Sequence, residues 1–129
     1  MGTCVRVTSQ GSAYARLRRA LDRGNAVVAW AAAGELERVP LADALALCLL
    51  LARSDRARYE KAALRWHARL CREIAGLSID EAALSLCALR ALPGPAAEAA
   101  GHALGVICER HGMRDATRRV EEWLERTCG

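Results

Sequence analysis

Two pairs of cysteine and histidine residues have a spacing that could bind a metal ion. His67 and Cys71 are four residues apart and Cys108 and His111 are three apart, so each pair would share one face of a helix. If the two helices were neighbours, two thiolates and two imidazoles could complete a tetrahedral zinc site. The alternative is that the cysteines are core residues and the histidines lie at the core boundary. A small metal or thiol regulatory protein, with zinc as its only cofactor, is one hypothesis for function.

A single carboxylate interrupts the most apolar stretch of the chain. Asp43 could be a catalytic group, but an aspartate in the first turn of a helix also interacts favourably with the helix dipole. The sequence contains no nucleophile motif, glycine-rich phosphate loop or paired-carboxylate signature. We therefore expect a protein that is not an enzyme, and we assign no catalytic residue.

Arginine dominates the basic residues, since Lys61 is the only lysine in a chain of net charge +4. Arginine stripes on helices can neutralise phosphates, which gives a second hypothesis, an arginine-dependent nucleic-acid-binding accessory protein. The alternative is a solvated helix face in a protein encoded by GC-rich DNA. One stripe comprises Arg16, Arg19 and Arg23, which we assign to nucleic acid, and the other comprises Arg65, Arg69 and Arg72.

These residues must be positioned by helices, and the central one is predicted over residues 41–52. Asp43 is its only polar residue, and Pro40 precedes it, where a proline is compatible with the start of a helix. A helix without a polar face must be covered on all sides. Twelve residues span about 18 Å, too short for a membrane core of about 30 Å. We therefore predict a buried central helix in an all-α bundle with no membrane contact.

Caps and breakers predict about seven antiparallel helices joined by short loops. Asn25 can cap the second helix, and Ser78 with Glu81 forms a capping box for the fifth. Residues 1–11 are expected to be a flexible tail, and residues 12–129 a single domain. The predicted helices cover residues 12–23, 25–38, 41–53, 54–75, 79–92, 95–111 and 114–126.

The six cysteines indicate a reducing compartment. Four of them lie in apolar helical stretches, where free cysteine behaves as a small hydrophobe. Residues 1–10 lack the apolar core of a signal peptide. We therefore expect free thiols and a cytoplasmic location.

The fourth predicted helix is apolar on two sides, which indicates that it faces a partner as well as the core. Leu64, Ala68 and Cys71 form a strip nearly opposite Trp66. Our first hypothesis is therefore a non-enzymatic interaction or scaffold module that binds a protein partner or forms a homo-oligomer. The residues assigned to that surface are Leu64, Arg65, Trp66, His67, Ala68, Arg69 and Cys71.

An internal repeat adds to the prediction of helical hairpins. Ala44-Leu-Ala-Leu-Cys48 recurs as Ala83-Leu-Ser-Leu-Cys87, which divides residues 41–75 and 79–111 into two related hairpins. Residues 24–36 and 55–62 resemble the second-helix signature of tetratricopeptide repeats, although the first-helix tryptophan, leucine, glycine and tyrosine are missing. The resemblance implies a solenoid-like helical bundle that binds protein. The whole chain is also similar to small helical proteins of high-GC actinobacteria, which implies no activity.

Overall fold

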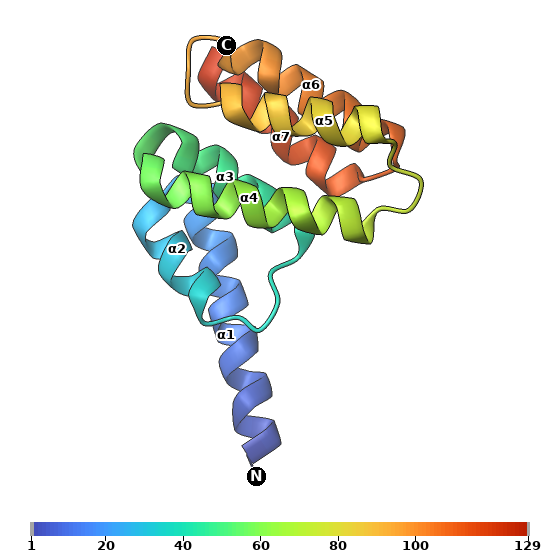
Figure 1. The fold of residues 1–129 in the computed structure, drawn as a ribbon. Coiled ribbons are helices and arrows are strands. Elements are labelled where there is room, and N and C mark those ends of the chain that lie inside the picture. The colour runs from blue at the N-terminus through green and yellow to red at the C-terminus, as the bar shows by residue number, and fades with distance from the viewer. Residues whose placement is uncertain (1, 129) are drawn as a thin grey trace. The chain divides into compact units, whose positions relative to one another are not determined.

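The computed structural model describes the backbone of residues 2–128 and the side chains of residues 9–127. This part of the chain contains seven α-helices and no strand, which confirms the predicted all-α class (Figure 1). The helices pack in antiparallel pairs. They are α1 (Gly2–Arg23), α2 (Ala26–Gly34), α3 (Leu41–Ser54), α4 (Arg56–Glu73), α5 (Ile79–Ala91), α6 (Ala97–Arg110) and α7 (Arg114–Cys128).

The chain divides into two compact units, Met1–Pro40 and Leu41–Gly129. The expectation of a single domain over residues 12–129 stays a prediction. In the first unit the backbone of residues 2–11, expected as a tail, is helical. The predicted helix start at Ser12 is therefore wrong, because Ser12 lies inside α1.

Polar contacts hold α2 against α1 in the first unit. Asn25 caps α2 through its side-chain oxygen, as predicted, but α2 ends at Gly34, before the expected boundary at residue 38. The Gln10 amide donates a hydrogen bond of 2.8 Å to the Glu35 carbonyl oxygen. The Arg16 guanidinium binds both carboxylate oxygens of Glu35, at 2.7 and 3.0 Å. The chain leaving α2 is thus fixed to the side of α1.

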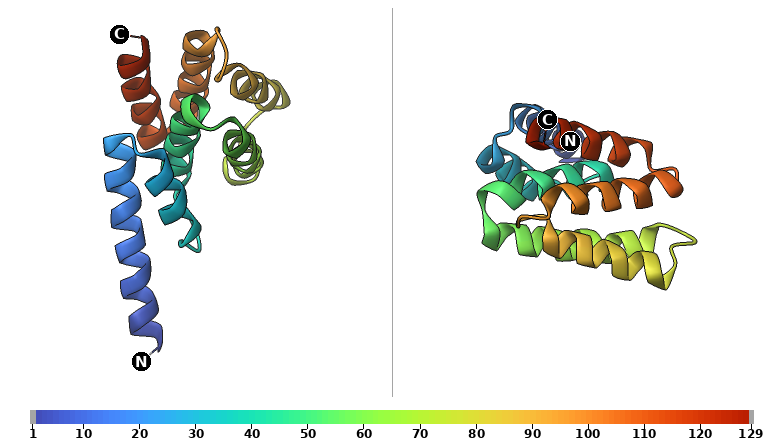
Figure 2. Two further views of the ribbon diagram at one scale, coloured as in Figure 1. Left: turned by 90° about the vertical axis from the view of Figure 1, so that its left-hand side faces the viewer. Right: turned by 90° about the horizontal axis from the view of Figure 1, so that it is seen from above.

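The second unit has three layers of helices (Figure 2). Helices α4 and α5 form one outer layer, α3 and α6 form the middle layer, and α7 forms the other outer layer. Helix α3 contacts α4 and α7, whereas α6 contacts α5 and α7. The middle helices are therefore covered by a layer on each side. Helices α4 and α5 are covered by a layer on one side only.

The middle layer contains the predicted central helix. No residue of 41–52 is exposed, and Leu45 is completely buried. Asp43 is also buried, and its carboxylate accepts a hydrogen bond of 3.1 Å from the Arg119 guanidinium of α7. The predicted buried helix is confirmed, and its one carboxylate forms an ion pair with the neighbouring layer.

Helices α6 and α7 approach closely at a glycine. A Cβ atom at Gly101 would lie 2.8 Å from the Trp123 ring and 2.9 Å from a methyl group of Leu124. Real Cβ atoms do not approach other heavy atoms so closely, so the glycine is what allows α7 to cross α6 here. This contact fixes α7 against the middle layer.

Candidate interaction surface on α4 and α5

Helix α4 has one buried face and one open apolar strip. Leu64 is 66 % exposed, and Ala68 and Cys71 are exposed beside it. The opposite side enters the core through Tyr59, Ala63, Trp66 and Leu70. The two apolar sides predicted for this helix are both present, and nothing in the described part of the second unit covers the outer one.

Helix α5 has a matching strip that our sequence analysis missed. Ile79 is 88 % exposed, Leu86 is 38 % exposed, and Ala83 is exposed between them. Their spacing of four and three residues places all three on one side of the helix. The sequence signal that could have revealed this strip is the spacing of Ile79, Ala83 and Leu86, which puts apolar residues on one side of α5. We call the six residues Leu64, Ala68, Cys71, Ile79, Ala83 and Leu86 the α4–α5 surface.

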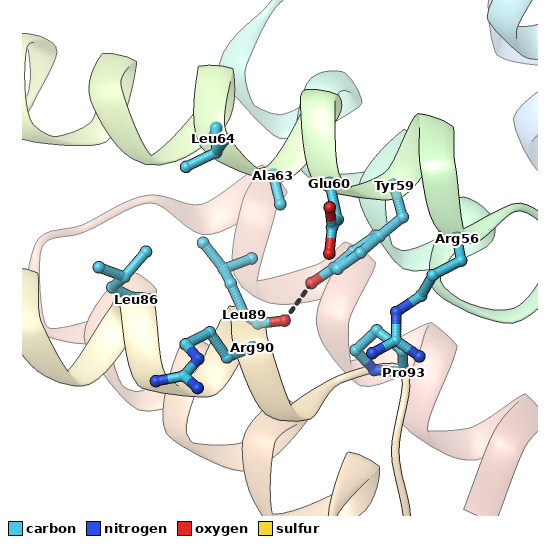
Figure 3. A pocket seen from close by; sticks show the side chains of 9 residues that line it. All are labelled: Arg56, Tyr59, Glu60, Ala63, Leu64, Leu86, Leu89, Arg90 and Pro93. Carbon is cyan, nitrogen blue, oxygen red and sulfur yellow. Dashed lines mark hydrogen bonds between the residues drawn. The ribbon is translucent and has the colours of Figure 1, made fainter.

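A groove of about 450 Å³ separates the two helices at one end of this surface (Figure 3). Leu64 and Leu86 point toward one another from opposite walls. The guanidinium groups of Arg56 and Arg90 lie at its edge, one on each helix. The complete lining is Arg56, Tyr59, Glu60, Ala63, Leu64, Leu86, Leu89, Arg90 and Pro93.

The floor of the groove contains a hydrogen bond that a proline makes necessary. The Leu89 carbonyl would normally accept from the N–H four residues later, but that residue is Pro93, which has no N–H. The Tyr59 hydroxyl donates to this carbonyl instead. Burial raises the pKa of Tyr59, so its phenol stays protonated and remains a donor. Tyr59 thus ties the end of α5 to α4.

A second hydrogen bond joins the other end of the two helices. The Nε2 atom of His67 lies 2.8 Å from the Ala82 carbonyl oxygen of α5. It also lies 4.0 Å from the Cys71 sulfur, one turn along α4. Contacts between α4 and α5 are sparser than those between the other paired helices. The two helices are therefore held at defined points with a groove between them.

The predicted capping box forms at the start of α5, and its Glu81 also contacts the end of α6. The Ser78 and Glu81 side chains each accept a hydrogen bond of 3.0 Å from the other residue's backbone N–H. The second carboxylate oxygen of Glu81 lies 2.9 Å from Nε2 of His111. The backbone hydrogen bond from Ser78, followed by that of His111, lowers the pKa of Glu81 to about 2.

The predicted four-residue zinc site is wrong. His67 and Cys71 lie on α4, Cys108 lies on α6 with His111 directly after it, and these two helices do not contact each other. Cys108 is completely buried, and burial raises the pKa of its thiol to about 11. Within residues 9–127, no three histidine, cysteine, aspartate or glutamate side chains form a group that could hold a metal. The spacing could not reveal that α5 lies between α4 and α6.

The two arginine stripes are partly engaged in ion pairs. The Glu35 carboxylate binds Arg16, which raises the pKa of Arg16 and lowers that of Glu35. On α4, Arg69 pairs with Glu73 at 2.8 Å. Arg19, Arg23, Arg65 and Arg72 are exposed. The assignment of Arg16, Arg19 and Arg23 to nucleic acid stays a prediction.

The residues assigned to a partner surface fall into two groups. Trp66 is 1 % exposed, and its indole N–H donates a hydrogen bond of 3.0 Å to the Leu41 carbonyl oxygen, so it belongs to the core. His67 and Arg69 are partly buried. Leu64, Arg65, Ala68 and Cys71 are exposed and open to a partner.

Comparison of the chain with protein-family models, curated proteins and solved structures gives no match. Among the described residues, no helix has both the length and the apolar character needed to traverse a bilayer. We therefore infer function from the geometry of the α4–α5 surface.

Proposed function

We propose that this chain is a non-enzymatic interaction module that binds another protein through the α4–α5 surface. The observation that carries the proposal is the exposure of Leu64 and Leu86 on the two walls of one groove, with Ile79 exposed on the same side of α5 as Leu86. Single exposed apolar residues are common on proteins, but contiguous ones mark sites of interaction. A partner would remove these side chains from water.

The energetics favour burial of these side chains by a partner. Complete burial of a leucine or isoleucine side chain contributes about 1.5–3 kcal/mol. Ile79 and Leu64 are mostly exposed, so most of this contribution is unused in the isolated chain. The fold does not need apolar residues at these two positions, because neither enters the core.

Nucleic-acid binding has less support. Arg16 is held by Glu35, which leaves Arg19 and Arg23 as the exposed members of its stripe. Two arginines would give only a weak dependence of binding on salt concentration.

A homo-oligomer remains one version of the protein-binding proposal.

The test is a comparison of the proteins that co-purify with four tagged forms of the chain from its host. The forms are the unchanged chain, Leu64→Asp, Leu86→Asp and the control Leu84→Asp. Leu84 is also exposed on α5. It is two residues from Leu86, which places it on the opposite side of the helix. We expect a protein identified by mass spectrometry to be lost with the first two variants and kept with the control. Recovery of the same proteins with all four forms would reject the proposal.

A further inference from the structure

The α4–α5 surface has the dimensions of a site for one helix. From Arg56 to Cys71, α4 advances by about 22 Å at 1.5 Å per residue. A helix of about 15 residues has the same length and places apolar residues every three or four positions along one strip. A small molecule in the groove would leave Ile79 and Cys71 in water, since neither lines it. The extent of the surface thus favours a helix over a small ligand.

The charges around the groove favour an acidic occupant. Arg56 and Arg90 lie on opposite walls, and among the described residues neither side chain forms an ion pair or hydrogen bond. Glu60 is the single carboxylate in the lining. Two guanidinium groups against one carboxylate give the groove a positive excess. Guanidinium groups bind carboxylates in a bidentate geometry. A glutamate or aspartate of the occupant could therefore form an ion pair with Arg56 or Arg90.

The same charges disfavour a second copy of this chain. A two-fold interface presents the same patch from both partners. The groove of a second copy would therefore bring a second Arg56 and Arg90 to an edge that already has a positive excess. A different protein can supply carboxylates without supplying more arginines.

We infer that the groove receives an acidic amphipathic helix of another protein. Its apolar strip lies between Leu64 and Leu86, and a carboxylate lies against Arg56, Arg90 or both. This inference rests on the proposed function, because it names the class of partner for that same surface.

The test uses two labelled helical peptides of about 15 residues, which share a leucine strip at helical spacing. One has glutamates beside the strip and the other has lysines. In fluorescence anisotropy at low salt, we expect the glutamate peptide to bind at least about tenfold more tightly. The double variant Arg56→Glu and Arg90→Glu should remove or reverse this preference. Lys61→Glu, an exposed α4 residue outside the groove lining, is the matched control and should retain most of it.

Three outcomes would overturn the inference. Equal affinities or tighter binding of the lysine peptide would show that the charge assignment is wrong. If Leu86→Asp then abolished binding and Leu84→Asp did not, the surface would still bind protein. If neither peptide bound but the chain formed dimers that Leu86→Asp abolished, the occupant would be a second copy. If peptides, dimers and co-purifying partners were all absent, the proposed function would fail with the inference. Circular dichroism of every variant checks that it is folded.

Discussion

Helices α3 and α5 contain nearly the same five-residue motif in opposite surroundings. The motif is Ala44–Cys48 in α3 and Ala83–Cys87 in α5. Leu45 is completely buried, whereas the equivalent Leu84 is 49 % exposed. The difference follows from position, because α3 lies in the middle layer and α5 in an outer one. Apolar composition thus does not determine burial; the number of covering layers does.

The two helices are also held in place by different interactions. Helix α3 is held by its buried leucines and by the ion pair between Asp43 and Arg119. Helix α5 is held by a smaller buried face that includes Ala88 and Leu89, by hydrogen bonds from His67 and Tyr59, and by the capping box at its start. This smaller buried face and the polar contacts fix α5 while its outer apolar side stays open.

The rate of thiol labelling should show the largest difference between the two motifs. Cys48 is completely buried, and burial raises the pKa of its thiol to about 12, whereas Cys87 is exposed. Labelling of Cys48 requires unfolding, which at a stability of about 5 kcal/mol slows it by a factor on the order of 1,000 or more. Peptide mapping after timed exposure to N-ethylmaleimide measures both rates. Similar rates at the two cysteines would contradict the buried position of α3.

Truncation of the paired leucines should have the next largest effect. Leu45→Ala would leave a cavity in the middle layer and lower the free energy of unfolding by about 2–5 kcal/mol. Leu84→Ala, at the equivalent position of α5, should change it by less than about 0.5 kcal/mol. Urea unfolding followed by circular dichroism measures both. A large loss for Leu84→Ala would mean that α5 is covered in the folded chain.

Removal of one hydroxyl group tests the polar attachment of α5. Tyr59→Phe would leave the Leu89 carbonyl without a donor, because Pro93 cannot supply one. An unsatisfied buried carbonyl costs about 1–3 kcal/mol of unfolding free energy. Tyr14→Phe, which alters an exposed hydrogen bond with Arg18, is the control and should have little effect. Equal stabilities of both variants and the unchanged chain would show that the Tyr59 bond does not secure α5.

Acid should weaken α5 through its capping box. The pKa of Glu81 is lowered from 4.5 to about 2 in the folded chain, so its stabilising effect is fully present above about pH 4.5. The effect is lost as pH falls toward 2, because the unfolded chain binds the proton first. Glu81→Gln should therefore lower the free energy of unfolding at neutral pH. It should also reduce the loss of this free energy as the pH falls from about 4.5 toward 2. Unfolding curves at several pH values measure the slope, and an unchanged slope would contradict the role of the cap.

The helices could be predicted from the sequence because their signals are local. Asn25 and Ser78 with Glu81 act within one helical turn, and the apolar stretch of residues 41–52 lies within a single helix. The predicted start of α1 at Ser12 was wrong because the residues before it show no helical periodicity of apolar residues. Helix boundaries depend on such local patterns, and they are lost where the pattern is weak.

The surface could be predicted only in part because it depends on which helices are neighbours. The strip of Leu64, Ala68 and Cys71 follows from helical period alone, and the structure places it in the open. The Leu86 side of the groove and the Tyr59 hydrogen bond depend on the packing of α4 against α5. The zinc hypothesis failed for the same reason, because Cys108 and His67 lie on helices that do not meet.

The most direct test of the α4–α5 surface is site-specific photo-crosslinking in the host. A photoreactive amino acid is placed at position 86 in one form of the chain and at position 84 in another. Both positions are exposed on α5, and they lie on opposite sides of it. We expect crosslinks to a partner protein from position 86 and none from position 84. Crosslinks to the same protein from both positions, or from position 84 alone, would contradict the assignment of this surface.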